Sequence, residues 1–222
     1  MKRYVTAKEL IDEGKATKVN INMVQLKYSL DECYSIRDAS YQTEIEYILD
    51  HPARTKAVVD LARVLKGNTL MLFSRIDAHL EVVRQQLEEL GINHRVITGS
   101  VDKDEREAIR TGMEDEDNCV LLATSATVAT GVSIKKLHNL VFCHPTKSVI
   151  RVLQSLGRVM RLHDTKECAQ LYDIVDDLSF EGRHNHCMRH AAERYGYYAA
   201  EKHPVKVRKI NLPEVKKHEE DS

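Results

Sequence analysis

The chain has 222 residues, of which 42% are hydrophobic and 30% are charged, a composition typical of an ordinary soluble globular protein with a substantial core. No apolar run is long enough to span a bilayer and no secretory h-region follows Met1, so we expect no membrane partner and a cytoplasmic location. The formal net charge of −1 gives no overall electrostatic reason to expect a nucleic-acid partner.

Local composition adds two expectations. The five cysteines are odd in number and scattered through apolar surroundings, which favours reduced core thiols over disulfides or a metal site. Basic residues outnumber acidic ones by nine to three between Arg183 and Lys217, with Tyr195, Tyr197 and Tyr198 interleaved. A surface that faces nucleic acid needs such a segment, although a charged run is more often a solvated helix face.

The first fifty residues differ from the rest of the chain. We expect a short helix over 6–14, a strand over 19–30 and a helix over 40–50. The pair Asp31-Glu32 follows an apolar stretch and resembles the magnesium-binding carboxylates of a Walker B box. No phosphate loop precedes the pair, so we do not interpret it as a metal site.

From His51 onward, helices alternate with short apolar strands. The pattern predicts helices over 52–67, 76–90, 102–113 and about 184–202, a further helix that contains Arg158, and strands over 69–73, 94–97, 119–123, 140–143 and 169–175. This alternation indicates an α/β protein with a mostly parallel sheet covered by helices on both faces. The tail from Pro204 has little apolar periodicity, and we expect it to be an extended or disordered arm.

Ligands of parallel sheets bind beyond the carboxyl ends of the strands. Four predicted strands are followed there by polar or small residues. These residues are Ser74 and Arg75, Thr98 and Gly99, Thr124 with Ser125, and His144.

The helix that ends in Gln154-x-x-Gly157-Arg158-x-x-Arg161 suggests phosphate chemistry. Its two arginines lie three apart on one helix face, and a guanidinium stabilises the charge that develops on a transferred phosphate. Gln154 would place a water or support an arginine. Gly157 indicates close backbone approach or a helix break, because glycine inside a helix costs roughly 0.5–1 kcal/mol relative to alanine. Two surface arginines on a helix remain the plain alternative.

Other features limit this interpretation. Gly131 and Ser133 lie in a loop that could approach a nucleotide, but a glycine in a loop is commonplace. The sequence contains no phosphate loop and no credible magnesium carboxylate, so the chain could complete a nucleotide site but not hold one alone. The histidines between His184 and His190 match no common zinc spacing, and we expect no metal site.

Together these stretches resemble the second RecA-like domain of superfamily 2 helicases. Residues 69–75 resemble motif IV, Thr98-Gly99 with Arg106 resembles the glycine-to-arginine element, residues 123–134 resemble motif V, and residues 154–161 match the Q-x-x-G-R-x-x-R form of motif VI. Residues 5–28 and the C-terminal helix also resemble the recombination and repair helicases of T-even phages. The resemblance implies a RecA-like, P-loop NTPase-type sheet with N-terminal and C-terminal helical extensions.

The resemblance also implies roles for individual residues. Arg158 and Arg161 become catalytic arginine fingers with Gln154, while Gly131, Ser133 and Gly157 line the ATP cleft. The residues that would touch nucleic acid are Ser74, Arg75, Thr98, Gly99, Arg106 and Thr124. Many relatives have aspartate where this chain has Ser133, so the resemblance does not extend to the ribose contact. ATP and Mg²⁺ would be held mainly by a first RecA-like domain.

The implied organisation has four parts. Residues 1–50 would be a linker or extension from a missing first motor domain, 51–182 the second RecA-like domain, 183–203 a basic helix, and 204–222 an extended or disordered tail. The implied function is that of an ATP-dependent helicase on branched DNA or RNA–DNA hybrids in recombination, fork rescue and repair, inside the host cytoplasm if a phage encodes it. The isolated chain would be inactive.

Two rival functions remain open from the residues. The chain could be a nucleic-acid-binding or protein-docking module with no ATPase role. It could also be a Rossmann-like transferase, but the first strand lacks a glycine fingerprint and Arg158 and Arg161 would then be unexplained.

Overall fold

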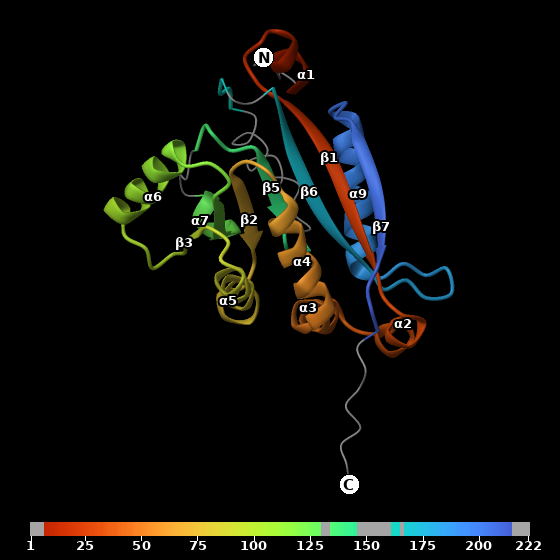
Figure 1. Ribbon diagram of the computed structural model, residues 1–222. Coiled ribbons are helices and arrows are strands. Elements are labelled where there is room, and N and C mark those ends of the chain that lie inside the picture. Colours follow the sequence, from red (N-terminus) through yellow and green to blue (C-terminus); the bar gives the residue numbers. More distant parts are fainter. Residues whose placement is uncertain (1–6, 130–133, 146–160, 165–166, 215–222) are drawn as a thin grey trace.

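The computed structural model describes residues 7–129, 134–145, 161–164 and 167–214 (Figure 1). The strands of these segments form one sheet in which every pair is parallel, in the order β3-β4-β2-β5-β6-β1-β7. The strands are β1 (Lys18–Lys27), β2 (Thr69–Phe73), β3 (His94–Ile97), β4 (Val120–Thr124), β5 (Asn139–Phe142), β6 (Cys168–Asp177) and β7 (Val205–Asn211).

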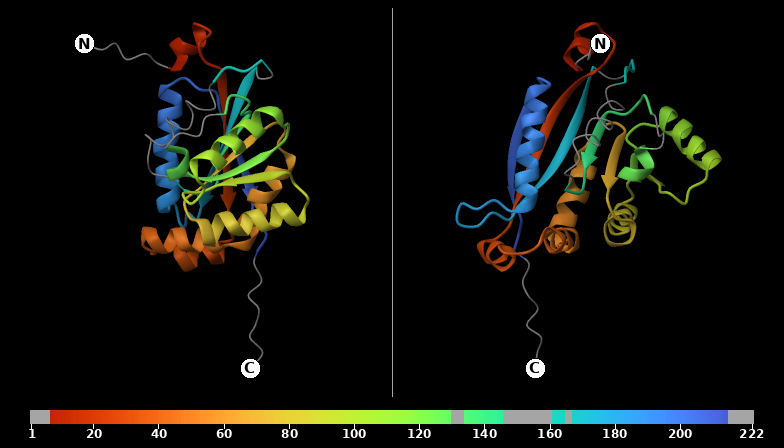
Figure 2. Two further views of the ribbon diagram at one scale, coloured as in Figure 1. Left: turned by 90° about the vertical axis from the view of Figure 1, so that its left-hand side faces the viewer. Right: turned by 180° about the vertical axis from the view of Figure 1, so that it is seen from behind.

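Helices pack on both faces of this sheet, as Figure 2 shows from two sides. The helices are α1 (Ala7–Asp12), α2 (Leu30–Ile36), α3 (Tyr41–Asp50), α4 (Pro52–Val64), the π-helix η1 (Ile76–Leu80), α5 (Glu81–Glu89), α6 (Lys103–Asp115), α7 (Ser125–Ala129) and α9 (His186–Ala200). Helices α6 and α9 pack on one face, and α3, α4 and α5 pack on the other. The predicted fold class is therefore confirmed.

The central strands are apolar along their whole length because both of their faces are covered. Every residue of β2 is buried, and so are the first four residues of β4. Local signals set the helix starts, since the side chains of Ser40 and Asp102 accept backbone N–H groups in the first turns of α3 and α6. The predicted helix over 76–90 is divided into η1 and α5 and ends before Gly91, whose φ is +65°.

Both ends of the described chain belong to the sheet, which differs from the expected organisation. Strand β1 lies between β6 and β7, so part of the segment 1–50 is built into the sheet. Residues Val205–Asn211, expected as an extended or disordered arm, form β7 beside β1. This strand escaped prediction because it lies at the edge of the sheet, where its side chains are mostly exposed and three of them are charged.

Two arginine–aspartate pairs are buried on opposite faces of β6. On the α4 side, Arg54 Nε donates to Asp176 Oδ1 over 2.7 Å and Nη2 donates to Oδ2 over 3.1 Å. On the α9 side, Arg194 donates to Asp173 through two bonds of 2.8 Å. All four side chains are almost completely buried. Burial alone would lower the pKa of Arg54, but the charge and the hydrogen bonds of Asp176, with smaller contributions from Tyr28 and Cys143, together raise it above its ordinary value.

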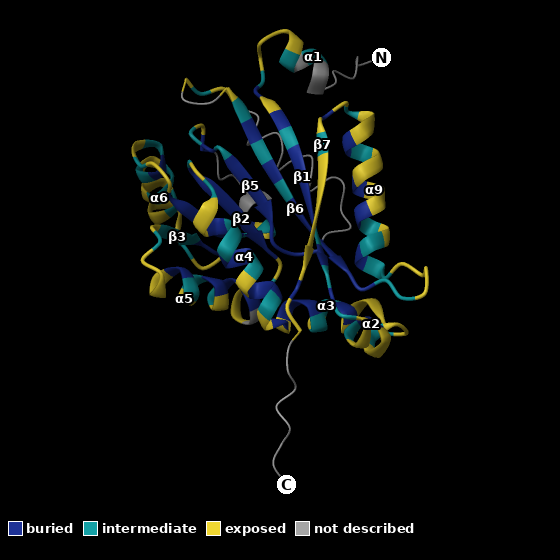
Figure 3. Ribbon diagram, turned by 45° about the vertical axis from the view of Figure 1, so that its right-hand side comes forward, coloured by how far each residue is buried: buried dark blue, intermediate teal, exposed yellow. Residues whose placement is uncertain are grey.

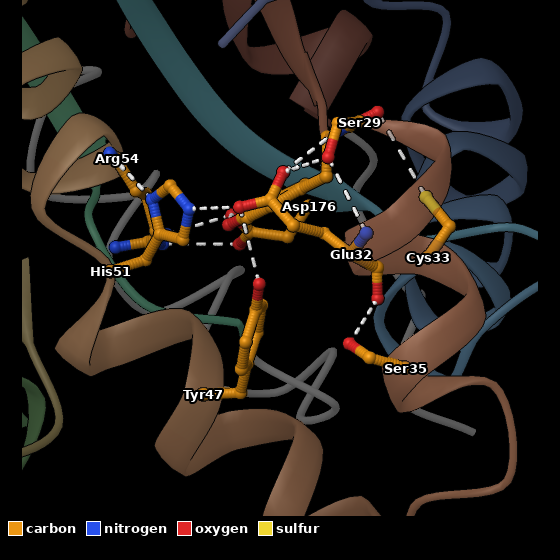
Figure 4. A network of polar contacts seen from close by, with 9 residues as sticks. Ser29, Glu32, Cys33, Ser35, Tyr47, His51, Arg54 and Asp176 are labelled. Carbon is orange, nitrogen blue, oxygen red and sulfur yellow. Dashed lines mark hydrogen bonds and ion pairs between the residues drawn. The ribbon is translucent and has the colours of Figure 1, made fainter. Parts of the chain in front are cut away.

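A polar network around Arg54 joins β6 to the N-terminal helices (Figure 4). His51 Nδ1 accepts the backbone N–H of Arg54 over 3.2 Å, while His51 Nε2 lies 2.7 Å from Glu32 Oε1. Glu32 also accepts hydrogen bonds from Tyr47 and from the Ser29 hydroxyl, and it closes the capping box of α2. The Asp31-Glu32 pair thus lies in a helix N-terminus, where Glu32 has a structural role.

A buried carboxylate fixes the start of α9. Glu44 of α3 accepts the backbone N–H groups of His186 and Cys187 over 2.9 and 2.8 Å and the side-chain amide of Asn185 over 2.8 Å. Negative charge at a helix N-terminus is stabilised by the helix dipole and by the free N–H groups. Glu44 therefore ties the first fifty residues to the C-terminal helix.

The buried pair on the α4 side gives a stability prediction. Asp176→Ala leaves the Arg54 guanidinium buried without a carboxylate, and we expect the free energy of unfolding to fall by about 3–5 kcal/mol in urea denaturation. The control is Asp60→Ala, which breaks the exposed Lys56–Asp60 pair within α4, the helix that also carries Arg54. This change should cost less than about 1 kcal/mol. Similar losses in the two variants would contradict this assignment.

The Glu32 network predicts a dependence of stability on pH. Burial alone would raise the pKa of Glu32, but hydrogen bonds from His51 and Ser29 lower it below the ordinary value of 4.5. A lowered folded-state pKa stabilises the protein above pH 4.5, and this contribution is lost as the pH falls further. Urea unfolding should therefore show a smaller loss of stability on acidification for Glu32→Gln than for the unmodified chain. The exposed Glu89→Gln is the control and should leave the acid profile unchanged.

Candidate functional site

The carboxyl ends of four strands meet at one edge of the sheet, as the predicted parallel arrangement requires. The register pairs Phe73 with Thr124, Ile97 with Ala123, and Leu72 with Phe142. The polar residues that follow these strands therefore come from neighbouring loops at the same edge. This carboxyl edge gathers Ser74, Arg75, Thr98, Gly99, Thr124 and His144.

The turn after β3 is held by Arg106 of α6. Arg106 Nη2 donates to the Gly99 carbonyl over 3.2 Å and to the Thr98 carbonyl over 3.5 Å. The Thr98 hydroxyl lies 2.8 Å from that of Ser100, and the Val101 N–H donates to the Thr98 carbonyl over 3.3 Å. The glycine and arginine that the sequence places seven residues apart are therefore in direct contact. Arg106 positions the turn and leaves Gly99 exposed.

The end of β4 leads directly into α7. The Thr124 hydroxyl accepts the Thr127 N–H over 3.3 Å and lies 2.7 Å from the Thr127 hydroxyl. The next residue, Ser125, lies 3.4 Å from His144 Nε2. His144 Nδ1 lies 3.1 Å from the Leu72 carbonyl, which can only accept, so Nδ1 donates this hydrogen bond. Sequence reasoning missed the Ser125–His144 contact, because no local pattern relates these two residues.

The loop after β2 contains an exposed serine and an arginine that forms only a weak ion pair. Ser74 is exposed, and the Arg75 guanidinium lies 3.6 Å from Glu46 of α3. Both partners of this ion pair are about half exposed, so solvent screens it and it contributes little to stability. An incoming phosphate can therefore compete with Glu46 for Arg75.

Most of the predicted nucleotide residues lie outside the described part of the chain. These are Gly131, Ser133, Gln154, Gly157 and Arg158. Arg161 is described, and its backbone carbonyl accepts a hydrogen bond from the Thr17 hydroxyl over 3.1 Å. Thr17 immediately precedes β1, so Arg161 lies near the amino end of that strand and apart from the carboxyl edge.

Among the described residues, the cavity beside Glu32 and the histidines of α9 do not match nucleotide or metal chemistry. A cavity of about 640 Å³ beside the Glu32 network is lined by several carboxylates, which would repel phosphates. The described residues contain no group of three histidine, cysteine, aspartate or glutamate side chains arranged to hold a metal. His186 and His190 instead pack against the Tyr41 ring, with centroids 5.8 and 5.3 Å away. No helix among the described residues is long and apolar enough to span a bilayer.

Comparison with known proteins assigns the family. Residues 53–163, half of the chain, match the model of the helicase conserved C-terminal domain. The chain belongs to the helicase C-terminal domain family. The matched range contains every residue of the carboxyl edge together with the Gln154–Arg161 motif.

Individual relatives agree with this family. The helicase domain is 27% identical over 224 aligned residues to the ATP-dependent DNA helicase uvsW of Enterobacteria phage T4, covering 94% of this chain and 44% of the relative. It is 20% identical over 171 residues to the putative ATP-dependent helicase IRC3 of Saccharomyces cerevisiae, covering 75% of this chain and 25% of the relative. The chain thus spans less than half the length of either protein.

A solved structure shows the same fold. The crystal structure of T4 UvsW matches with a TM-score of 0.77 and 23% sequence identity, over 89% of this chain and 42% of that one. At this level of identity the match supports the RecA-like architecture and does not by itself assign residue roles.

The Arg106 contact gives a prediction for this helicase domain. Arg106→Ala removes two hydrogen bonds to turn carbonyls, each worth about 0.5–1.5 kcal/mol, so we expect amide hydrogen exchange in the 98–101 turn to become about tenfold faster. The control is Arg110→Ala on the same helix, whose guanidinium pairs with Glu107. It should leave that turn unchanged, and equal acceleration by both variants would show that Arg106 has no specific role.

Proposed function

We propose that this chain is the C-terminal motor domain of an ATP-dependent helicase and completes an ATP site formed with a first RecA-like domain. The observation that carries the proposal is the carboxyl edge, where three loops of the helicase family motifs converge and the glycine-to-arginine element is in contact. The family match over residues 53–163 supports the same function.

The proposed nucleic-acid grip uses the loops at this edge. Ser74 and Arg75 follow β2, Thr98 and Gly99 follow β3 with Arg106 behind them, and Thr124 ends β4. Hydroxyl groups, backbone N–H groups of a turn and the weakly paired Arg75 guanidinium are typical hydrogen-bond partners of phosphate oxygens rather than of base edges. We therefore expect weak sequence preference and binding that falls steeply with salt concentration.

The proposed nucleotide half-site uses the motif-bearing segments outside the described residues together with Arg161. Arg158 and Arg161 would stabilise charge on the transferred phosphate, with Gln154 orienting a water or an arginine. Gly131, Ser133 and Gly157 would line the cleft. ATP supplies the phosphoryl group and Mg²⁺ neutralises its charge, and both would be held mainly by the first domain.

The proposed substrate is DNA, because the phage T4 relative, aligned over 94% of this chain, is named as a DNA helicase. More specifically, we propose that the helicase acts on branched DNA or RNA–DNA hybrids, with roles in recombination, fork rescue and repair. The partner that the proposal requires is an N-terminal RecA-like domain of the same protein. The setting would be the cytoplasm of the host if a phage encodes the protein.

The arginines provide the test of this function. With the chain joined to a matching first RecA-like domain, Arg158→Ala and Arg161→Ala should each lower DNA-stimulated ATP hydrolysis by about 10³-fold or more. Arg110→Ala, which changes a surface arginine paired with Glu107, should leave turnover within about twofold.

The isolated chain is the second arm of that experiment. It should hydrolyse negligible ATP and should bind DNA weakly and in a salt-sensitive manner. Unchanged turnover in both arginine variants would contradict the arginine-finger roles and leave a nucleic-acid-binding or docking module as the function. Strong hydrolysis by the chain alone would contradict the half-site.

A further inference from the structure

One face of the sheet is left open beside α4. Among the described residues, no helix lies in front of most of β6, β1 and β7 on this side, as Figure 3 shows. We call this the open face and define it by Asn20, Asn22, Gln170, Tyr172, Lys206 and Arg208. It is separate from the carboxyl edge, whose loops follow β2, β3, β4 and β5.

Strand register places these side chains together. Asn22 pairs with Tyr172 on one side and with Lys206 on the other, so the three residues form a row across three strands. Residues paired across parallel strands project to the same face, and Tyr172 packs at the margin of the core cluster on the α4 side. Arg208 lies two residues beyond Lys206 on the same face.

The open face carries positive charge that no described carboxylate neutralises. Lys206 and Arg208 are exposed, and neither forms an ion pair with another described residue. Burial raises the pKa of Tyr172, and the positive charge of Arg208 on the same face opposes that rise. The one carboxylate of β6 on this face, Asp176, is buried and bound by Arg54.

The chemistry of the face indicates the kind of partner. Its inner side chains, Val24, Ile174 and Asn22, are buried, and Asn22 donates to the Gln170 amide oxygen over 3.1 Å. The accessible groups are the amides of Asn20 and Gln170, the Tyr172 phenol ring and two cations. The exposed Ile210 lies near the carboxyl end of β7. Protein interfaces centre on an apolar core, whereas nucleic-acid interfaces are polar and positive. Surfaces that hold single strands combine cations for phosphates with aromatic rings for bases.

We propose that the open face binds a second stretch of single-stranded nucleic acid. Lys206 and Arg208 contact its phosphates, Tyr172 stacks with a base, and the amides of Asn20 and Gln170 lie within the same platform. This site goes beyond the proposed motor function, because it requires neither ATP nor the loops of the carboxyl edge.

Neighbouring residues of β7 supply a matched test. Arg208 lies on the open face and Lys209 on the opposite one, and both are exposed. Binding of the 222-residue chain to a fluorescein-labelled oligothymidylate is measured by anisotropy at low salt. Arg208→Glu should weaken binding about tenfold and flatten its salt dependence, while Lys209→Glu should change affinity by about twofold at most. Thermal melting of both variants verifies that each is folded.

Photocrosslinking identifies the contact directly. An oligonucleotide that carries 5-iododeoxyuridine should crosslink to Tyr172, and the crosslink should persist in Arg75→Glu, which disrupts the carboxyl edge. It should disappear in Tyr172→Leu, which keeps an apolar side chain at that position.

Three results would overturn the proposal. Equal weakening by Arg208→Glu and Lys209→Glu would show a diffuse charge effect, and no weakening by Arg208→Glu would show that the face is not used. Displacement of the oligonucleotide by poly-glutamate at equal charge concentration would assign the face to an acidic protein segment. The Tyr172 crosslink in Arg75→Glu separates this proposal from the nucleic-acid grip proposed at the carboxyl edge. If the carboxyl edge does not bind nucleic acid, the crosslink to Tyr172 should still form.

Discussion

The fold depends on pairing two arginines that are buried on opposite faces of one strand. Asp173 and Asp176 lie three residues apart on β6, so they project to opposite sides of the sheet. Each accepts a bidentate arginine from a helix, Arg194 of α9 and Arg54 of α4. An unpaired charge in such a position would cost several kcal/mol. The two helix layers are therefore fixed to the same strand, each by its own charge pair.

The pair on the α4 side reaches beyond β6 toward the carboxyl edge. Arg54 Nη2 donates to the Cys143 carbonyl over 2.9 Å, and Nη1 lies 3.3 Å from His79 Nε2 in η1. Since a guanidinium can only donate, His79 Nε2 accepts and the ring is neutral, in agreement with a pKa that burial and Arg54 lower well below its usual value. One buried cation, Arg54, therefore contacts both the carboxyl end of β5 and the helix η1 that follows β2. The loop with Ser74 and Arg75, one of the three to which we assign nucleic-acid binding, lies between β2 and η1.

Much of this architecture could be predicted from the sequence because its signals are local. The strands predicted at Thr69–Phe73 and His94–Ile97 coincide with β2 and β3, and the caps Ser40 and Asp102 begin the expected helices. The approach of Arg106 to Gly99 also agrees with the motif spacing. In each case the information lies within about ten residues of the element it specifies.

What escaped prediction depends on partners far away in the sequence. Strand β7 alternates charged and aliphatic residues, and its only strand partner in the sheet, β1, lies near the other end of the chain. Arg54 and Glu44 look like ordinary polar residues of exposed helices, yet Asp176 and the start of α9 bury them. Strand β6 is longer than its apolar run because the aspartates at its end are neutralised by tertiary contacts. Propensity and periodicity contain no information about such pairings.

The central claim is that this chain supplies one half of a composite nucleotide site. The most direct measurement is the equilibrium binding of a fluorescent ATP analogue with Mg²⁺, first to the chain alone and then to the chain joined to a first RecA-like domain. The account predicts no saturable binding to the chain alone, and binding to the joined protein that weakens when Arg161 is changed to alanine. Equally tight binding to the chain alone would contradict the account.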